Sequence, residues 1–558
     1  MMATKKLFTG INALVISIVF LSILNVVRCL FTLKGGYMTA DEALYFSPAI
    51  FHLRTGTPIE FYGHRTLFQF LITVPMLIFN INNVFKMIVL ASGISLFLTV
   101  LTQLFLFKIS AIIFKDKMKR FLLVLTYPAL AIFSIMSVTY LTEPLSIFAI
   151  TAFIYFTICF FKNGNSYKQL FFMIIFLNIV VLTRETNMMI FLANLIVIPI
   201  FMMKYGCSFK QLTIFVGLTL PFARIPLSID LSSIMIIEPL VNYFTITFTN
   251  IVSQITQSFQ PHYVSQTVTE YSSTGIVPVS SMEAYPPSEL YTHSPLSDIN
   301  LSRFFITAKY FILSLFIGWN PIFAMVGLSC FIVFIKNMKK TDFITCFLFI
   351  NGIAAIISFV FLTFYTMDPF VIDLINSVPL GTLIRYVHVS IPASLMMVMF
   401  YKRLEQKHIT VFVLILIITL GSTTPFAMQF IQKGFSTGYV ERISTDYMAP
   451  YYRAYLYADD SGETLMFFGH NSLLLSLYML EKPDVVLARP TSDQVSFRHI
   501  INSRDYDSII FYGVKHFTHD SGLKEYFPYY YDVITFNTKY QLEVLYEDEE
   551  MYLYRLMK

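Results

Sequence analysis

The segment TGINALVISIVFLSILNVVRCLFTL, residues 9–33, decides the fold class of this chain. It is almost entirely apolar and long enough to cross a bilayer, because about 20 residues at about 1.5 Å each span a hydrocarbon core of roughly 30 Å. Lys5 and Lys6 precede the segment, and no small-residue cleavage site precedes Arg28. This pattern predicts a retained first membrane helix rather than a signal peptide.

The composition of the whole chain agrees with a membrane protein. Of its 558 residues, 56% are hydrophobic and 13% are charged, and the mean hydropathy is +0.66. Soluble globular chains carry about 25% charged residues, so lipid must replace water over much of this surface. The five cysteines form no CxxC pair and are predicted to be small packing residues; they are Cys29, Cys159, Cys207, Cys330 and Cys346.

Further apolar runs predict an α-helical polytopic protein with roughly eleven membrane spans. The runs are approximately 9–33, 85–107, 121–140, 143–161, 170–183, 187–203, 211–229, 304–335, 343–364, 384–400 and 409–429. Residues 67–82 are also apolar but would form a helix only about 24 Å long. Because counting them as a span would invert every later loop, we expect a re-entrant or interfacial helix on the outer side.

The basic residues orient the predicted spans, because short cytoplasmic loops are enriched in Lys and Arg. Alternate loops are basic, with Lys5, Lys6, Lys108, Lys115, Lys117, Lys119, Arg120, Lys162, Lys168, Lys204, Lys210, Lys336, Lys339, Lys340, Lys402, Arg403 and Lys407. The other loops hold Asp41, Glu42, Glu60, Glu143, Glu185, Asp230, Asp368 and Asp373. The pattern predicts a cytoplasmic N-terminus and an outer C-terminus, and the spread of the net charge of +5 over separate loops argues against a nucleic-acid partner.

Two water-exposed regions complete the predicted organisation. The outer loop 230–303 is rich in Ser, Thr, Tyr and Pro, and is either a flexible connector or a lid or binding loop. From about residue 430, TLMFFG, DVVLA and SIIFYGV are typical of short buried strands, NSLLLSLYML is typical of a helix, and QLEVLYEDEEMYLYRLMK of a hairpin. We therefore predict a membrane domain over 1–429 with outer loops 34–84 and 230–303, and a soluble α/β domain over 430–558.

Charged residues gather at the outer ends of the spans, and the first group is Asp41 and Glu42. Thr39 and Glu42 form a capping box, which predicts a helix start near Ala40. Both carboxylates can serve only to favour the N-terminus of that helix. Since the capping box explains Glu42 better than Asp41, the equally weighted alternative is that one carboxylate is a base facing a cavity at the membrane surface.

The second and third groups precede apolar helices. His64 and Arg65 come just before the short apolar run, where Arg65 is either an interfacial residue or a phosphate ligand, because guanidinium matches phosphate geometry. Glu143 begins a predicted span, and Pro144 suits its first turn. Glu143 is therefore either a helix-start carboxylate or a residue of a site.

The last two groups lie in a short outer turn and at a late span. Arg184 and Glu185 either pair with each other or serve a site, and Arg385 opens the tenth span together with His388, which alone is more typical of a packing residue. A charge at the centre of a membrane helix costs about 2.5–3.5 kcal/mol, so charges clustered at one face call for an explanation. A base with phosphate-binding cations at one depth on the outer side points to transfer from a lipid phosphate; the set is Asp41, Arg65, Glu143, Arg184 and Arg385.

This pattern resembles the GT-C superfamily of polyprenyl-phosphate-sugar glycosyltransferases, which includes the protein O-mannosyltransferases and the lipid A aminoarabinose transferase. The segment 40–45 (ADEALY) is similar to the acid pair of its first outer loop, and 141–145 (LTEPL) to the acid of its second. The segment 60–67 (EFYGHRTL) fills the place of an aromatic, basic segment but lacks the family's Pro-Pro pair. Arg385-Tyr386 followed by Pro392 resembles a late Arg-Tyr motif.

The resemblance implies inverting transfer of a sugar from a polyprenyl-phosphate donor to a glycan, lipid or protein acceptor at the outer face of a plasma membrane, such as a bacterial inner membrane. Catalytic roles fall to Asp41 as general base, with Glu42 and Glu143. Substrate binding falls to His64, Arg65, Arg184, Arg385 and Tyr386. The sequence has no Gly-rich phosphate loop, so no nucleotide is expected. No residue is assigned to a metal, and participation of a divalent metal stays open.

Three other functions compete with this interpretation. A lipid-linked polysaccharide ligase or polymerase shares outer charges and long outer loops, but the early acid pair favours transfer of a single sugar. A transporter is typified by charges or broken helices near mid-membrane and a repeat between halves, and the sequence indicates neither. A non-catalytic scaffold or receptor does not require clustered arginines and carboxylates.

Overall fold

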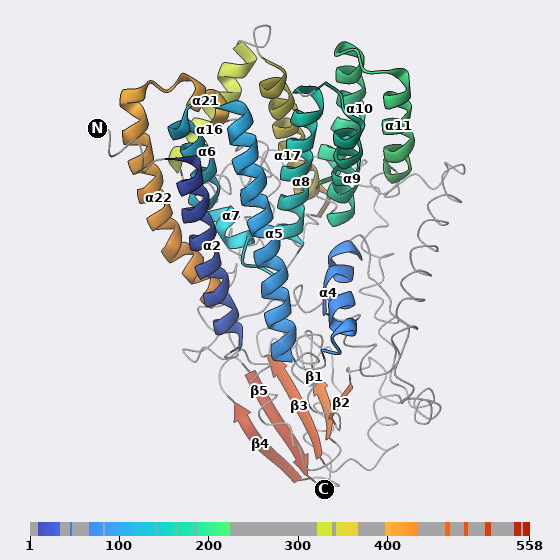
Figure 1. Ribbon diagram of the computed structural model, residues 1–558. Helices are drawn as coiled ribbons and strands as arrows, with labels where there is room; N and C mark the ends of the chain where they lie inside the picture. Colours follow the sequence, from blue (N-terminus) through green and yellow to red (C-terminus); the bar gives the residue numbers. More distant parts are fainter. Residues whose placement is uncertain are drawn as a thin grey trace.

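The structure is a computed structural model that describes residues 9–33, 45–46, 49, 66–81, 84–140, 142–162, 164–184, 187–223, 321–336, 342–366, 395, 397–433, 464–468, 485–488, 508–514, 541–547 and 551–557. Within these residues a bundle of apolar helices stands on one side of a β-sheet (Figure 1). In the part of the chain that the structure describes, four helices are long and apolar enough to cross a membrane: Gly10–Leu33, Phe85–Ile113, Glu143–Lys162 and His408–Pro425.

The helices follow the predicted apolar runs. They are α2 (Gly10–Leu33), α4 (Thr66–Ile78), α5 (Val84–Ile113), α6 (Lys117–Ala129), α7 (Ala131–Met136), α8 (Glu143–Lys162), α9 (Tyr167–Thr183), α10 (Met188–Lys204), α11 (Phe209–Thr219), η3 (Leu220–Ala223), α16 (Pro321–Lys336), α17 (Phe343–Thr366), α21 (Met397–Arg403) and α22 (Gln406–Lys433). The number of spans, the capping box at Ala40 and the loop 230–303 fall partly or wholly outside the described residues.

The predicted basic loops meet at one end of the bundle, which we call the basic end. Lys162 donates to the carbonyl of Ile112 at 2.9 Å, and Lys119 donates to that of Lys402 at 3.0 Å. Lys402 forms an ion pair with Asp342 at 2.8 Å. Connections distant in the sequence therefore lie together, as the alternation of charge requires, and Figure 1 shows the start of α2 and the end of α5 at this same end.

The short apolar run 67–82 forms α4, a helix that ends at Ile78 and contains Pro75. It packs against α5 and α9, and in Figure 1 it lies toward the end of the bundle opposite the basic end. Its buried residues Phe68, Ile72 and Met76 belong to a hydrophobic cluster separate from the main core. The prediction of a short helix at this position is confirmed, while its relation to a membrane stays a prediction.

The predicted span 121–140 is broken in the structure. Helix α6 ends at Ala129, just after Pro128, and Leu130 is extended (φ −81°, ψ 111°) before the short α7. The hydroxyl of Ser134 donates to the carbonyl of Pro128 at 2.7 Å, so a polar group at the break is satisfied. The chain then runs without helix through residues 137–140 before α8 begins at Glu143. Hydropathy cannot detect this break, because the residues on both sides are apolar.

The C-terminal strands form one five-stranded sheet of order β2-β1-β3-β5-β4. The strands are β1 (Thr464–Phe468), β2 (Val485–Ala488), β3 (Ser508–Val514), β4 (Gln541–Glu547) and β5 (Met551–Met557). β1 pairs in parallel with β2 and β3, whereas β5 is antiparallel to β3 and β4. The predicted strands and the terminal hairpin are confirmed. The predicted helix within 471–480 lies outside the described residues, and the domain boundary stays a prediction.

Figure 1 shows the sheet beyond the end of the bundle at which α2 ends and α5 begins. We call this the sheet end. The order β2-β1-β3 requires crossover connections between parallel strands, and such connections need a dozen or more residues. The segments 469–484 and 489–507 are long enough for this. The site described below lies within the helical bundle, and its depth is given relative to the sheet end.

Candidate functional site

The non-helical segment 137–140, with α7 before it and α8 after it, lies deep inside the helical bundle. Its backbone is held by a polar stripe on α5. Ser95 donates to the carbonyl of Thr139 at 2.8 Å, and Thr99 donates to that of Ser137 at 3.4 Å. With a rise of about 1.5 Å per residue, Ser95 lies about 16 Å from the start of α5 at the sheet end. The non-helical segment thus lies inside the bundle, more than about 10 Å from the end of α5 that is nearer the sheet, as the roughly 16 Å for Ser95 indicates.

Satisfied hydrogen bonds explain how this turn can exist in an apolar bundle. Away from water, each unpaired backbone group would cost several kcal/mol, so irregular backbone is tolerated only where protein partners replace water. The bonds from α5 supply such partners, and Thr139 also donates to the carbonyl of Met136 at 2.9 Å. The serines and threonines of α5 are therefore part of the architecture of the turn.

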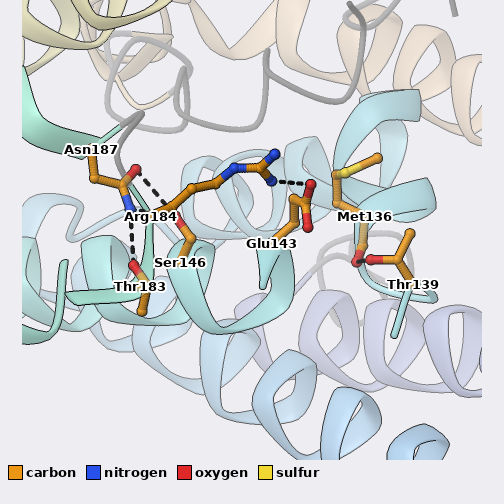
Figure 2. A network of polar contacts seen from close by, with 7 residues as sticks. All are labelled: Met136, Thr139, Glu143, Ser146, Thr183, Arg184 and Asn187. Atoms are coloured by element: carbon orange, nitrogen blue, oxygen red, sulfur yellow. Dashed lines mark hydrogen bonds and ion pairs between the residues drawn. The ribbon is translucent and has the colours of Figure 1, made fainter. Parts of the chain in front are cut away.

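Glu143 and Arg184 form an ion pair at this turn, as Figure 2 shows. Glu143 is the first residue of α8, and Arg184 directly follows the end of α9. The side chains are 0% and 3% exposed, so the pair is almost completely removed from solvent. Two residues predicted separately from different outer loops are thus in contact. The alternative pairing of Arg184 with Glu185 lies outside the described residues.

Asn187 fixes the turn that carries Arg184. Its side-chain nitrogen donates to the carbonyl of Val180 and to the hydroxyl of Thr183, both at 2.9 Å, and its side-chain oxygen accepts from the hydroxyl of Ser146 on α8 at 3.2 Å (Figure 2). Its backbone N–H donates to the carbonyl of Arg184 at 3.1 Å. Asn187 is fully buried. It therefore ties the α9–α10 turn to the helix that begins with Glu143, which sets the relative position of the two charges.

The environment makes each charge depend on the other. A buried charge loses several kcal/mol of hydration, and only a well-placed partner recovers this. The nearby hydroxyls and amide of Ser146, Thr183 and Asn187 bond to one another and to backbone, so the immediate surroundings are polar. The arrangement can hold a carboxylate ionised beside a guanidinium, which is a combination suited to binding an anionic group or orienting a hydroxyl.

The structure adds residues to the site that the sequence analysis did not select. Arg28 on α2 is fully buried, and its guanidinium carbon lies 5.4 Å from the centre of the Tyr140 ring. Tyr140 accepts a hydrogen bond from Ser92 on α5 at 3.0 Å. An arginine inside a run as apolar as 9–33 is itself a signal, because such charges are expensive in a membrane helix. Asn187 gave no comparable signal in the sequence.

Most predicted site residues fall outside the described part of the chain. They are Asp41, Glu42, His64, Arg65, Arg385 and Tyr386. Their assignments stay predictions, and only Glu143 and Arg184 are placed. Nearby in the sequence, Tyr45 and Phe46 are fully buried in a hydrophobic cluster with Phe68, Tyr140 and Leu145. The segment just after Asp41 and Glu42 therefore contacts the same part of the bundle as the residues before and after Glu143.

Metal ligands were sought among the described residues. No group of three or more His, Cys, Asp or Glu side chains within them is placed to hold a metal ion. The five cysteines are free thiols, and two of them, Cys159 and Cys330, are buried. His64, Asp41 and Glu42 lie outside the described residues.

No family model matches the chain, and no curated protein matches it. Among solved structures, it is similar to an archaeal oligosaccharyltransferase from Archaeoglobus fulgidus in complex with an inhibitory peptide and a dolichol-phosphate, with 10% identity, a TM-score of 0.44, and coverage of 90% of this chain and 69% of that chain. The chain is similar to the same enzyme in a complex with Zn and sulfate, with 13% identity, a TM-score of 0.45, and coverage of 89% of this chain and 67% of that chain.

The chain is also similar to ArnT from Cupriavidus metallidurans in the apo state, with 12% identity, a TM-score of 0.41, and coverage of 96% of this chain and 97% of that chain. These proteins are GT-C glycosyltransferases, the superfamily that the sequence motifs resemble.

Proposed function

We propose that this protein is an integral membrane glycosyltransferase that moves a sugar from a polyprenyl-phosphate donor to a glycan, lipid or protein acceptor at the outer membrane face. The observation that carries the proposal is the buried ion pair of Glu143 and Arg184, held where the chain breaks its helix inside an apolar bundle. Both residues belong to a sequence motif that resembles the family or to the outer charge clusters of this chain, and the fold brings them into contact.

A purely structural role explains this pair poorly. Apolar residues of similar size often stabilise a protein as well as a buried ion pair does, or better. The pair is also accompanied by a helix break, which requires additional hydrogen bonds from Ser95 and Thr99. Buried, paired charges at irregular backbone are typical of functional sites, where strain and desolvation serve binding or catalysis.

The chain also allows Asp41 to approach this site. Tyr45 is buried in the cluster that contains Tyr140, and Tyr140 precedes Glu143 by three residues. Four peptide units extend at most about 14 Å. This short tether to a residue in the same cluster as Tyr140 supports the assignment of Asp41 as the general base of the reaction, with Glu42 next to it in the sequence.

In the proposed reaction, the acceptor oxygen attacks the anomeric carbon of the donor while the bond from that carbon to the phosphate oxygen breaks. Asp41 takes the proton of the acceptor hydroxyl, and the electron pair of the broken bond leaves with the lipid phosphate. Attack opposite to the leaving group inverts the anomeric configuration. The products are a new glycosidic bond and a free polyprenyl phosphate, so no nucleotide is consumed.

The cations stabilise the charge that develops on the leaving phosphate. In this proposal Arg184 serves the site while its pairing with Glu143 fixes its direction, and Glu143 orients the acceptor or the base. His64, Arg65, Arg385 and Tyr386 complete the donor site, as the sequence motifs predict. Guanidinium groups suit this task because their planar forks match the oxygens of a phosphate.

The test measures release of free polyprenyl phosphate from polyprenyl-phosphate sugars by the purified protein, with a crude envelope extract as the source of acceptors. The wild-type protein is compared with Asp41→Asn. We expect release by the wild type and its loss in the variant, because the amide cannot accept the proton. Normal turnover by Asp41→Asn would remove the base assignment, and absence of release by a folded wild type with every donor would contradict the function.

Asp342→Asn is the matched control for this experiment. Asp342 is a carboxylate at the basic end of the bundle, where it is paired with Lys402. Partial burial raises the pKa of its carboxyl, but the hydrogen bonds from Lys402 and Thr345 outweigh this effect and hold the pKa below its ordinary value of 3.8. It is therefore ionised at neutral pH, and its substitution removes one negative charge far from the site. We expect release of polyprenyl phosphate by Asp342→Asn to match the wild type.

A further inference from the structure

Arg28 is a buried charge that the proposed reaction does not use. It lies on α2, five residues before the helix ends at Leu33, which is about 8 Å along the axis. Its side chain has no exposed surface. A charge within an apolar membrane helix is costly, so a hydrophobic residue would be the ordinary choice at a packing position.

The contacts of Arg28 join three separate parts of the bundle. Its guanidinium lies over the ring of Tyr140, 5.4 Å from the ring centre, and its Nη1 donates to the carbonyl of Ile431 at 3.3 Å. Tyr140 belongs to the segment that leads into Glu143. Ile431 lies in the last turn of α22, the helix after which the chain continues to the strands of the sheet. The carbonyl of Arg28 also accepts a bond from Thr32 at 2.9 Å.

We propose that Arg28 is a positioning residue that clamps the segment leading into Glu143 against α2 and the last turn of α22. The inference rests on the proposed function, because the group that it positions is Glu143. The hydroxyl of Tyr140 also accepts a hydrogen bond from Ser92 on α5, so two helices hold the tyrosine. Since Tyr140 precedes Glu143 by only three residues, holding the ring limits where the carboxylate can lie.

The chemistry of arginine suits this role. A planar guanidinium stacks on an aromatic face and still directs N–H groups sideways to a carbonyl, whereas lysine is a point charge without a planar face. Methionine fills a similar volume but offers neither interaction. The clamp also ties the helix that precedes Asp41 to the helix that precedes the sheet. Movements at the sheet end are thereby coupled to the position of Glu143.

The first measurement is kinetic and compares Arg28→Met, Tyr140→Leu and their double variant with the wild type. We expect kcat to fall by about 100-fold in each single variant, because misplacement by about 1 Å has effects of this size. The KM for the donor should change little, since the proposed phosphate ligands are other residues. The double variant should be no worse than either single variant, because both changes break the same contact.

Two variants control for the loss of a cation and of a hydroxyl. Lys108 on α5 also lies over aromatic rings, 5.6 Å from the centres of both Phe105 and Tyr155. It lies near the basic end of α5, so Lys108→Met removes a comparable interaction outside the proposed clamp and should leave kcat unchanged. Tyr140→Phe keeps the ring beneath Arg28 and should lose much less activity than Tyr140→Leu.

The second measurement does not depend on catalysis. Thr142, next to Glu143, is fully buried and is replaced by cysteine in a chain whose native cysteines are changed to alanine. A water-soluble maleimide should label this cysteine slowly in the otherwise wild-type chain and much faster with Arg28→Met. Arg28→Lys, which keeps a cation over the ring, should give an intermediate rate and serves as the second variant if Arg28→Met does not fold.

The outcomes separate the clamp from the proposed function. If the wild type transfers no sugar, the proposed function fails, while the labelling experiment still tests the clamp. Unchanged kcat and unchanged labelling in folded Arg28→Met or Arg28→Lys protein would overturn the clamp. A raised donor KM at wild-type kcat would also overturn it, because Arg28 would then bind the donor instead of positioning Glu143.

Discussion

The guanidinium of Arg184 is buried, and in place of water it has the carboxylate of Glu143 as a partner, with neutral polar side chains nearby. The same exchange occurs at Arg28, where the partners include an aromatic ring and a carbonyl. In both cases the charge sits beside a segment that is not helical. Desolvation makes such residues sensitive to the loss of a partner, and this sensitivity gives the site its most direct test at the scale of single residues.

The pair of Glu143 and Arg184 should behave as a unit in stability measurements. Arg184→Ala removes the ion-pair partner of a buried carboxylate and should destabilise the protein by about 3–5 kcal/mol. The double variant Glu143→Leu, Arg184→Met should recover most of this loss, because two apolar side chains need no partner. The melting temperature in detergent measures both effects.

Ser146→Ala is a milder comparison at the same turn, since it removes one neutral hydrogen bond to Asn187. It should cost about 1 kcal/mol. Equal melting temperatures for Arg184→Ala and Ser146→Ala would mean that the ion pair is hydrated or does not form in the folded protein. All stability variants at this turn are expected to lose activity, so only the melting temperatures bear on this prediction.

Among the helices, α5 combines two roles along its length. Its apolar residues pack against α2 and α8, and its hydroxyls bind a neighbouring segment that has left the helical conformation. In an apolar environment, serine and threonine hydroxyls usually bond to the carbonyl one turn earlier in their own helix. Ser110 follows this pattern with the carbonyl of Phe107 at 2.7 Å, whereas Ser95 bonds to the carbonyl of Thr139.

This difference between two buried serines of one helix predicts different costs of substitution. Ser95→Ala leaves a buried carbonyl of Thr139 without this donor and should cost about 1–3 kcal/mol of stability. Ser110→Ala removes a bond to a carbonyl that already belongs to the helix and should cost clearly less. Thermal unfolding of the two variants in the same detergent gives the comparison, and an equal or reversed order would contradict the role of α5.

In the whole molecule, the basic connections lie at one end of the bundle and the sheet lies at the other (Figure 1). This arrangement predicts how the protein is oriented in the membrane. Lys402, Asp342, Lys119 and Lys162 contact one another or neighbouring backbone at the basic end. Cytoplasmic loops attract lysine and arginine, so the sheet end should face outward. A site sunk below the sheet end would then open toward the outer leaflet, where a lipid-linked donor can enter.

Cysteine labelling tests this topology with exposed, described residues in a chain whose native cysteines are replaced. Lys336→Cys, at the end of α16, should react with an impermeant maleimide only after the cells are permeabilised. Val544→Cys on β4 and Phe79→Cys after α4 are 55% and 70% exposed before substitution and should react in intact cells. The reverse pattern would invert the topology, and labelling of Phe79→Cys only after permeabilisation would show that α4 crosses the membrane.

Sequence patterns alone predict the membrane character, most of the described helices and the strands of the sheet. Apolar runs of sufficient length form helices whatever their neighbours are, and α2 and α8 match the predicted spans within a residue at each end. The strands around TLMFFG and SIIFYGV follow from short apolar runs between turn residues. These signals are local, because hydration and backbone hydrogen bonding act on each segment separately.

Only the tertiary structure decided which polar residues meet. Glu143 and Arg184 stand 41 positions apart in the sequence, and no local pattern distinguishes their pairing from one with Glu185. The break at Leu130 and the non-helical segment before Glu143 are equally invisible to hydropathy, since the residues around them are apolar and the segment is held by Ser95 and Thr99 on another helix. The contact of Arg28 with Tyr140 has the same origin. Charges and irregular backbone become tolerable in an apolar bundle only when distant segments supply partners, and that supply is a property of the folded chain.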